Sequence, residues 1–102
     1  MLDIRVKDKK GVQSPGEVID QYIIQGLNIG VRQLARALNV PPNRIYQIIQ
    51  NKREISVDTA IRLGYFLDMS PSFWLDIQTQ YQLHAAAIEH PEIQSEVLPL
   101  KK

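Results

Sequence analysis

The sequence predicts an all-α protein, a bundle of five helices. Apolar residues recur at intervals of three and four along most of the chain, which places them on one face of a helix. Prolines and capping residues stand where several of these segments would begin. Short connections join the segments, and no stretch shows the alternating pattern of a strand. With 102 residues and 44% hydrophobic content, the chain can build one core, so we expect one domain.

An N-terminal arm is expected to precede the first helix, since residues 1–13 show no helical periodicity. Ser14 then supplies a capping hydroxyl, Pro15 suits the first turn, and Glu17 completes a capping box three residues after the cap. Gly26 is expected to end this helix. Its predicted buried stripe is Val18, Ile19, Tyr22 and Ile23.

Prolines mark the boundary between the second and third predicted helices. Apolar residues at positions 31, 34, 35 and 38 predict a second helix of about eight residues that stops at Asn39. Pro41 and Pro42 cannot extend that helix, whereas a proline is tolerated in the first turn of the next one. The third helix is therefore expected at about residues 42–50. Its inward-facing residues are predicted to be Ile45, Ile48 and Ile49.

The last two predicted helices begin at hydroxyl caps. Ser56 caps the fourth helix, and Ser70 followed by Pro71 begins a longer fifth helix, which Pro91 ends or kinks. The buried face of the fourth helix is predicted to be Val57, Ala60, Ile61, Gly64 and Leu67. That of the fifth helix is predicted to be Trp74, Ile77, Tyr81, Ala85 and Ile88. The expected divisions of the chain are an arm at 1–13, a helical domain at 14–90 and a flexible tail at 91–102.

Positive charge is concentrated around the second and third helices. Residues 31–53 contain five lysines and arginines and no aspartate or glutamate, whereas residues 54–100 contain seven acidic residues and one arginine. The formal net charge of +1 conceals this asymmetry. A basic segment without acids favours a polyanionic partner, because a carboxylate there would repel phosphates. The alternative is an ordinary fluctuation of surface charge along the chain.

The second and third helices have the features of a helix-turn-helix motif. Such a motif needs a small residue where the helices cross, a turn residue that accepts a positive φ, and apolar residues that lock the second helix in place. Ala35 meets the first requirement, and Asn39 meets the second because asparagine tolerates left-handed backbone geometry. The predicted structural positions are Leu34, Ala35, Asn39, Val40, Ile45 and Ile48.

The third helix is predicted to enter the major groove of DNA and read base edges. Asparagine and glutamine pair bidentately with adenine, arginine pairs with guanine, and tyrosine contacts a thymine methyl group or a phosphate. The outward positions are Asn43, Arg44, Tyr46, Gln47 and Gln50. Phosphate contacts are expected from Arg32, Gln33, Asn51, Lys52 and Arg53. The alternative for the amide side chains is ordinary solvated helix surface, and the surrounding motif and basic segment favour recognition.

A dimer or partner interface is the second surface that the sequence suggests. Large aromatic residues at helical spacing are usually core residues, and that alternative is favoured for the two adjacent aromatics at positions 73 and 74. Their functional alternative is an anchor at an interface. The candidates on the fifth helix are Phe73, Trp74, Ile77 and Tyr81.

Other classes of function find little support. The chain has no cysteine, so no disulfide, thiolate-held zinc or cysteine nucleophile can form. His84 and His90 lie six residues apart, which is not the spacing that places two metal ligands on one helical face, so no metal or other cofactor is expected. Asp58 and Thr59 are attributed to helix capping rather than catalysis. With no apolar run suited to a signal peptide or membrane span, we expect a cytoplasmic, nucleoid-associated protein that is not an enzyme.

Three segments of the sequence resemble the HigA family of antitoxins, in the same order and at similar spacing. They read SPGEVI, QLARALNVPPNRIYQIIQNKREISVDTAIRL and SPSFWLDIQ, and the resemblance runs from about Ser14 to His84. Asn39 and Asn51 stand where the family often has glycine. The resemblance implies a five-helix domain of the lambda-repressor-like (Cro/XRE) helix-turn-helix type.

The resemblance also implies partners. A family member would form a homodimer, bind a palindromic operator of its own operon, and neutralise a HigB-like toxin that cleaves mRNA and is a separate chain. Two alternatives share the fold. One is a stand-alone repressor without a toxin, and the other is an interaction module that does not bind DNA.

Overall fold

The computed structural model describes residues 12–101, and these residues form helices and loops without any strand. The all-α prediction is therefore confirmed. The predicted arm at residues 1–13 lies outside the described residues except for its last two positions. The helices are α1 (Pro15–Val18), the π-helix η1 (Ile19–Gln25), α2 (Val31–Leu38), α3 (Pro42–Ile49), α4 (Val57–Leu67), α5 (Ser72–Glu89) and α6 (Ile93–Glu96).

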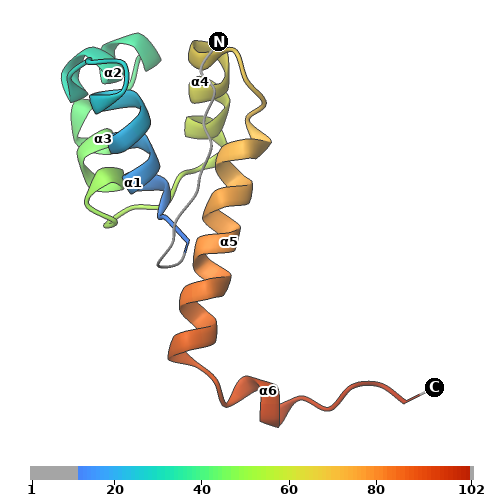
Figure 1. The fold of residues 1–102 in the computed structure, drawn as a ribbon. Helices are drawn as coiled ribbons and strands as arrows, with labels where there is room; N and C mark the ends of the chain where they lie inside the picture. Colours follow the sequence, from blue (N-terminus) through green and yellow to red (C-terminus); the bar gives the residue numbers. More distant parts are fainter. Residues whose placement is uncertain (1–11, 102) are drawn as a thin grey trace.

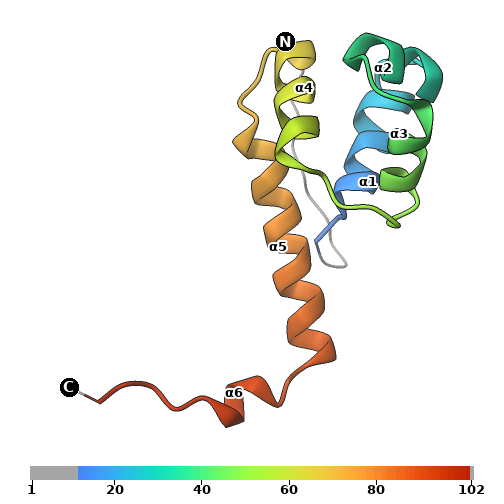
Figure 2. The same ribbon diagram turned by 180° about the vertical axis from the view of Figure 1, so that it is seen from behind.

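The helices form two groups that pack against each other. Figures 1 and 2 show α1, α2 and α3 together on one side, with α4 and α5 on the other. Contacts between α1 and α5 and between α2 and α4 join the groups. The far half of α5 projects beyond the other helices, and the segment that contains α6 leads away from it, which gives the molecule extents of 52 × 26 × 25 Å. No helix in the described part of the chain is both long and apolar enough to cross a membrane.

The first helix begins at the predicted capping box. The Ser14 hydroxyl accepts a hydrogen bond from the backbone N–H of Glu17 at 3.2 Å, and the Glu17 carboxylate accepts one from the backbone N–H of Ser14 at 3.0 Å. Gly16 then allows α1 to touch α3, since a β-carbon at this position would collide with the backbone carbonyl oxygen of Ile48. The chain continues from α1 into η1 without a break, and Gly26 caps η1 as predicted.

Two asparagines end helices in the left-handed conformation that usually favours glycine. Asn39 follows α2 with φ 57°, and Asn51 follows α3 with φ 59°. These are the two positions where the sequence departs from the family pattern. Asparagine tolerates this conformation better than other residues with side chains, so the departure leaves both turns intact.

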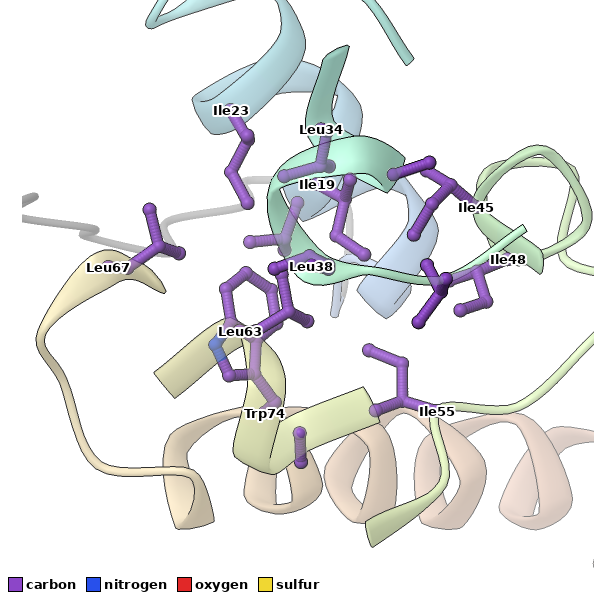
Figure 3. Packing of buried hydrophobic residues seen from close by; sticks show 14 residues of the cluster. Ile19, Ile23, Leu34, Leu38, Ile45, Ile48, Ile55, Leu63, Leu67 and Trp74 are labelled. Carbon is purple, nitrogen blue, oxygen red and sulfur yellow. The ribbon is translucent and has the colours of Figure 1, made fainter. Parts of the chain in front are cut away.

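One hydrophobic core joins the two groups of helices. Figure 3 shows their side chains meeting, with Trp74 projecting from α5 into the cluster. Trp74 is fully buried, yet its indole N–H has no hydrogen-bond partner among the described residues. The buried apolar residues are Val18, Ile19, Ile23, Leu34, Ala35, Leu38, Val40, Ile45, Ile48, Ile55, Ala60, Leu63, Leu67 and Trp74.

The predicted buried face of α4 is wrong in part. Val57 and Ile61 are 61% and 40% exposed, while Thr59 and Leu63 are buried beside the correctly predicted positions. The helix carries apolar residues on two faces, and only the face that contacts α2 and α5 is covered. The prediction for Ile88 is also wrong: it is 69% exposed because it lies on the part of α5 that projects beyond the bundle.

Candidate nucleic-acid interface

α2 and α3 are locked into a helix-turn-helix arrangement by buried side chains. Leu34 and Ala35 on α2 pack with Ile45 and Ile48 on α3 in the core. The turn between them is held by a hydrogen bond from the backbone N–H of Val40 to the carbonyl oxygen of Ala35, at 3.0 Å. The motif therefore has a fixed internal geometry, and its outer surface is available to a ligand.

The outer surface of α3 is polar. Asn43 and Gln50 are exposed, and Tyr46 is 43% exposed. Arg44 and Gln47 are half-buried, and each already has a partner within the protein. The Arg44 guanidinium donates to Asp58 at 2.8 Å, and the Arg53 guanidinium donates to the side-chain oxygen of Gln47 at 3.2 Å. All five predicted base-contacting residues thus lie on α3 or at its end, on a face with accessible polar groups.

The two ends of the motif present the predicted phosphate-contacting residues. Arg32 and Gln33 are exposed in the first turn of α2, whose N-cap residue Gly30 provides no side chain to the free backbone N–H groups. Such an uncapped helix start favours phosphate oxygens. Beyond α3, Asn51, Lys52 and Arg53 are exposed in the loop, as is Glu54, which follows them.

The loop after α3 is fastened to α5 by two glutamines that no sequence motif indicated. Gln78 accepts a hydrogen bond from the backbone N–H of Ile55 at 2.6 Å and donates one to the carbonyl oxygen of the same residue at 2.9 Å. Gln82 donates to the Glu54 carboxylate at 2.8 Å. These contacts join residues 23 and 28 positions apart, so no local pattern in the sequence announces them.

A second missed feature is a carboxylate shared by two arginines. Asp58 accepts hydrogen bonds from Arg62 at 2.9 Å and from Arg44 at 2.8 Å, and Arg62 also donates to the carbonyl oxygen of Leu38 at 2.9 Å. The hydrogen bonds from Arg62 and then Arg44 lower the pKa of Asp58 below its ordinary value of 3.8. The spacing of Asp58 and Arg62, four residues apart on one helix, was a signal that pointed to their pairing.

The structure changes the set of interface candidates on α5. Trp74 is wrong as an interface residue, because it is fully buried in the protein's own core. Phe73 meets it edge-on, with ring centroids 5.2 Å apart, and Phe73 and Ile77 are partly buried against the same core. Tyr81 is half-buried. Two other apolar side chains are exposed to a greater degree. Tyr65 on α4 is 86% exposed, and Leu83 further along α5 is 66% exposed.

No grouping of three or more potential metal-ligating side chains occurs within residues 12–101. α3 presents a polar outer surface with exposed basic side chains at both ends of the motif, and comparison with known proteins gives the chain a family. Residues 23–74 match the helix-turn-helix family. Antitoxin HigA-1 of Vibrio cholerae is 30% identical over 94 residues, which cover 92% of this chain and 89% of that protein.

A solved structure is similar over nearly its whole length. An addiction module antidote protein of a HigA family from Coxiella burnetii is 34% identical, with a TM-score of 0.82, and the match covers 86% of this chain and 97% of that one. The chain belongs to the HigA family of antitoxins. A second HigA structure, the Pseudomonas aeruginosa antitoxin solved with the higBA promoter, is 36% identical with a TM-score of 0.81, covering 87% and 98% of the two chains. Membership in the HigA family confirms the resemblance and the Cro/XRE type of fold.

Proposed function

We propose that this HigA-family protein binds an operator in its own promoter through α3 and represses its own operon. The observation that carries the proposal is the acid-free outer face of the motif. Across residues 31–53, every charged side chain is a lysine or arginine. The next acids along the chain are Glu54, which accepts a hydrogen bond from Gln82, and Asp58, which faces two arginines that offset its charge. This arrangement favours approach to the phosphate backbone.

The base-contacting residues are assigned from their places around α3. At about 100° per residue, Asn43, Gln47 and Gln50 fall within one narrow sector of the helix. Tyr46 and Arg44 lie on opposite flanks of this sector. We assign the central three to bases at the floor of the groove, and the flanking two to bases at its sides. The groups assigned to phosphates are Arg32, Gln33, Asn51, Lys52 and Arg53.

A homodimer would place two copies of α3 in successive major grooves. Such half-sites lie about 34–36 Å apart on one side of the DNA, so the operator should be an inverted repeat. We assign the dimer contact to α5, with Phe73, Ile77 and Tyr81 between its start and its middle. Leu83 and Ile88 leave further apolar surface on its projecting half. Bound to its operator, the protein would reside on the bacterial nucleoid in the cytoplasm.

DNA binding is tested with duplexes covering the promoter of the protein's own gene. DNase footprinting should reveal a protected inverted repeat. In fluorescence anisotropy titrations, Gln47→Ala should cost about 1–3 kcal/mol at one base pair of each half-site, whereas Lys52→Ala should weaken all sequences alike and lower the salt slope by about one. Normal operator binding by both variants would contradict the site assignment. Failure of the wild-type protein to bind any duplex at about 50 mM salt would instead favour an interaction module without DNA binding.

The second part of the proposed function is neutralisation of a HigB-like toxin that cleaves mRNA. Family membership supports this role, and V. cholerae HigA-1 is named as an antitoxin. The test is to co-express the product of the adjacent gene, isolate the complex, and measure whether the purified antitoxin suppresses cleavage of an mRNA. Operator binding without any such partner would leave the protein as a stand-alone repressor.

A further inference from the structure

One carboxylate oxygen on α4 accepts hydrogen bonds from two arginines that lie on different helices. The Oδ2 atom of Asp58 accepts a hydrogen bond from Nη1 of Arg44 at 2.8 Å and another from Nε of Arg62 at 2.9 Å. Arg44 lies on α3, whereas the other two residues lie on α4. Arg44 belongs to the assigned DNA-contacting residues, whereas Asp58 and Arg62 do not.

A second arginine holds the Asp58 carboxylate independently of Arg44. Arg62 holds Asp58 from one helical turn further along α4, and the same guanidinium donates through Nη1 to the carbonyl oxygen of Leu38 at the end of α2. A weaker contact reaches the carbonyl oxygen of Asn39 at 3.5 Å. Asp58, whose side chain is 54% exposed, is thus linked through Arg62 to the turn of the motif on one side and hydrogen-bonds Arg44 on the other.

Because of its position on α3, Arg44 would bind DNA better if its side chain were already held in place. It is the third residue of α3, and the first turn of a recognition helix is the part that reaches base edges. A free arginine side chain loses rotamer entropy when it is ordered. Holding the side chain in advance removes part of that cost from DNA binding. Only Nη1 is engaged, so Nη2 and Nε have no hydrogen bond among the described residues.

The pairing also selects the kind of DNA group that Arg44 can contact. A guanidinium beside a carboxylate attracts a phosphate weakly, because the two anions would repel each other across it. A guanine edge carries no net charge and requires only donors in the correct direction. The free donors of Arg44 therefore suit guanine O6 and N7 better than the DNA backbone.

We propose that Asp58 is a positioning residue for base recognition, which holds Arg44 so that its unpaired guanidinium donors meet a guanine in each half-site. The inference rests on the proposed function, since it requires α3 to read DNA. It assigns sequence specificity to a residue on α4 that does not itself contact a base.

The experiment measures operator affinity and base preference for Asp58→Asn, Arg44→Ala and the double variant. Each G·C pair of the half-site is replaced in turn, and a duplex of unrelated sequence reports non-specific binding. Arg44→Ala should lower operator affinity about 5- to 150-fold and abolish the preference at one G·C pair. Asp58→Asn should relax the preference at that same pair and lower operator affinity about 3- to 30-fold. The double variant should be no weaker than Arg44→Ala alone.

Matched controls separate positioning from general charge and from folding. Asp76→Asn removes an exposed carboxylate from α5, and it should leave base preference unchanged. Arg44→Lys keeps the charge but lacks the planar fork, so it should weaken the guanine preference while keeping the salt slope. Circular dichroism and thermal melts of each variant establish that the fold is retained.

Failure of the proposed function and failure of the positioning role give different results. If Arg44→Ala binds the operator normally, the assignment of Arg44 to a base in the proposed function is wrong. If Arg44→Ala loses its guanine preference but Asp58→Asn keeps it, or if the two effects multiply in the double variant, then positioning by Asp58 is refuted. Equal strengthening of operator and unrelated DNA by Asp58→Asn would also refute it, because Asp58 would then act only by repelling DNA.

Discussion

Replacing Gly16 with alanine tests the contact that places α3 on the body of the protein. The added β-carbon would collide with the carbonyl oxygen of Ile48 and lie 2.9 Å from the α-carbon of Ile49. Both obstacles are backbone atoms, so the helices must move apart. Overpacking of this kind costs about 1–3 kcal/mol, and rigid neighbours favour the upper end. Alanine recovers about 1 kcal/mol through its higher helix propensity, which leaves a net loss of about 2 kcal/mol.

Urea denaturation followed by circular dichroism measures this loss of unfolding free energy. In a thermal melt, the same loss should lower the melting temperature by about 8–16 °C. Gly30→Ala is the matched control, because no atom lies within 4 Å of the place a β-carbon would take and the φ of −79° suits any residue. Its weaker N-cap preference and its smaller unfolded-state entropy roughly cancel. If Gly16→Ala proves as stable as the wild type, the close packing of α1 on α3 is not what holds the recognition helix.

Three further predictions concern stability. Trp74→Ala should cost about 3–5 kcal/mol in urea denaturation, while Trp74→Phe should cost far less because the indole N–H has no partner to lose; equal losses would refute this. Asn39→Ala should lower the free energy of unfolding by about 1–2 kcal/mol because its φ is 57°, whereas Asn39→Gly should be nearly neutral, and a neutral alanine variant would contradict the left-handed turn. The pKa of Asp58 is lowered in the folded state, so its stabilising contribution is complete above the unfolded value and is lost as the pH falls below about 3.8 towards the folded pKa. The difference in unfolding free energy between wild type and Asp58→Asn should therefore stay constant from pH 7 to pH 5 and shrink at pH 3; a constant difference down to pH 3 would show that the pairing does not perturb Asp58.

Local signals in the sequence were sufficient for the helix boundaries around the motif. Asn39 and Pro42 act within one turn of themselves, through backbone preferences that do not depend on the rest of the fold. The prediction that α2 stops at Asn39 and that α3 starts at Pro42 is confirmed. The same is true of the capping box at Ser14.

Local signals failed wherever two apolar faces competed or where partners lay far apart in the chain. On α4, Val57 and Ile61 fit a helical stripe as well as Thr59 and Leu63 do, and only the positions of α2 and α5 decide between them. Trp74 illustrates a related ambiguity, because hydrophobicity suits a core and an interface equally. The pairing of Arg44 with a residue 14 positions away depends on how α3 and α4 pack, which no local spacing encodes.

The double hydrogen bond between Gln78 and Ile55 has a consequence for how DNA preference is divided within the protein. It ties the loop after α3 to α5 through both backbone polar groups of Ile55. In a dimer formed through α5, the angle at which the two long helices cross would set the distance between the two copies of α3. The base sequence of each half-site would then depend on α3, whereas the number of base pairs between the half-sites would depend on α5. Either could change in evolution while the other stayed constant.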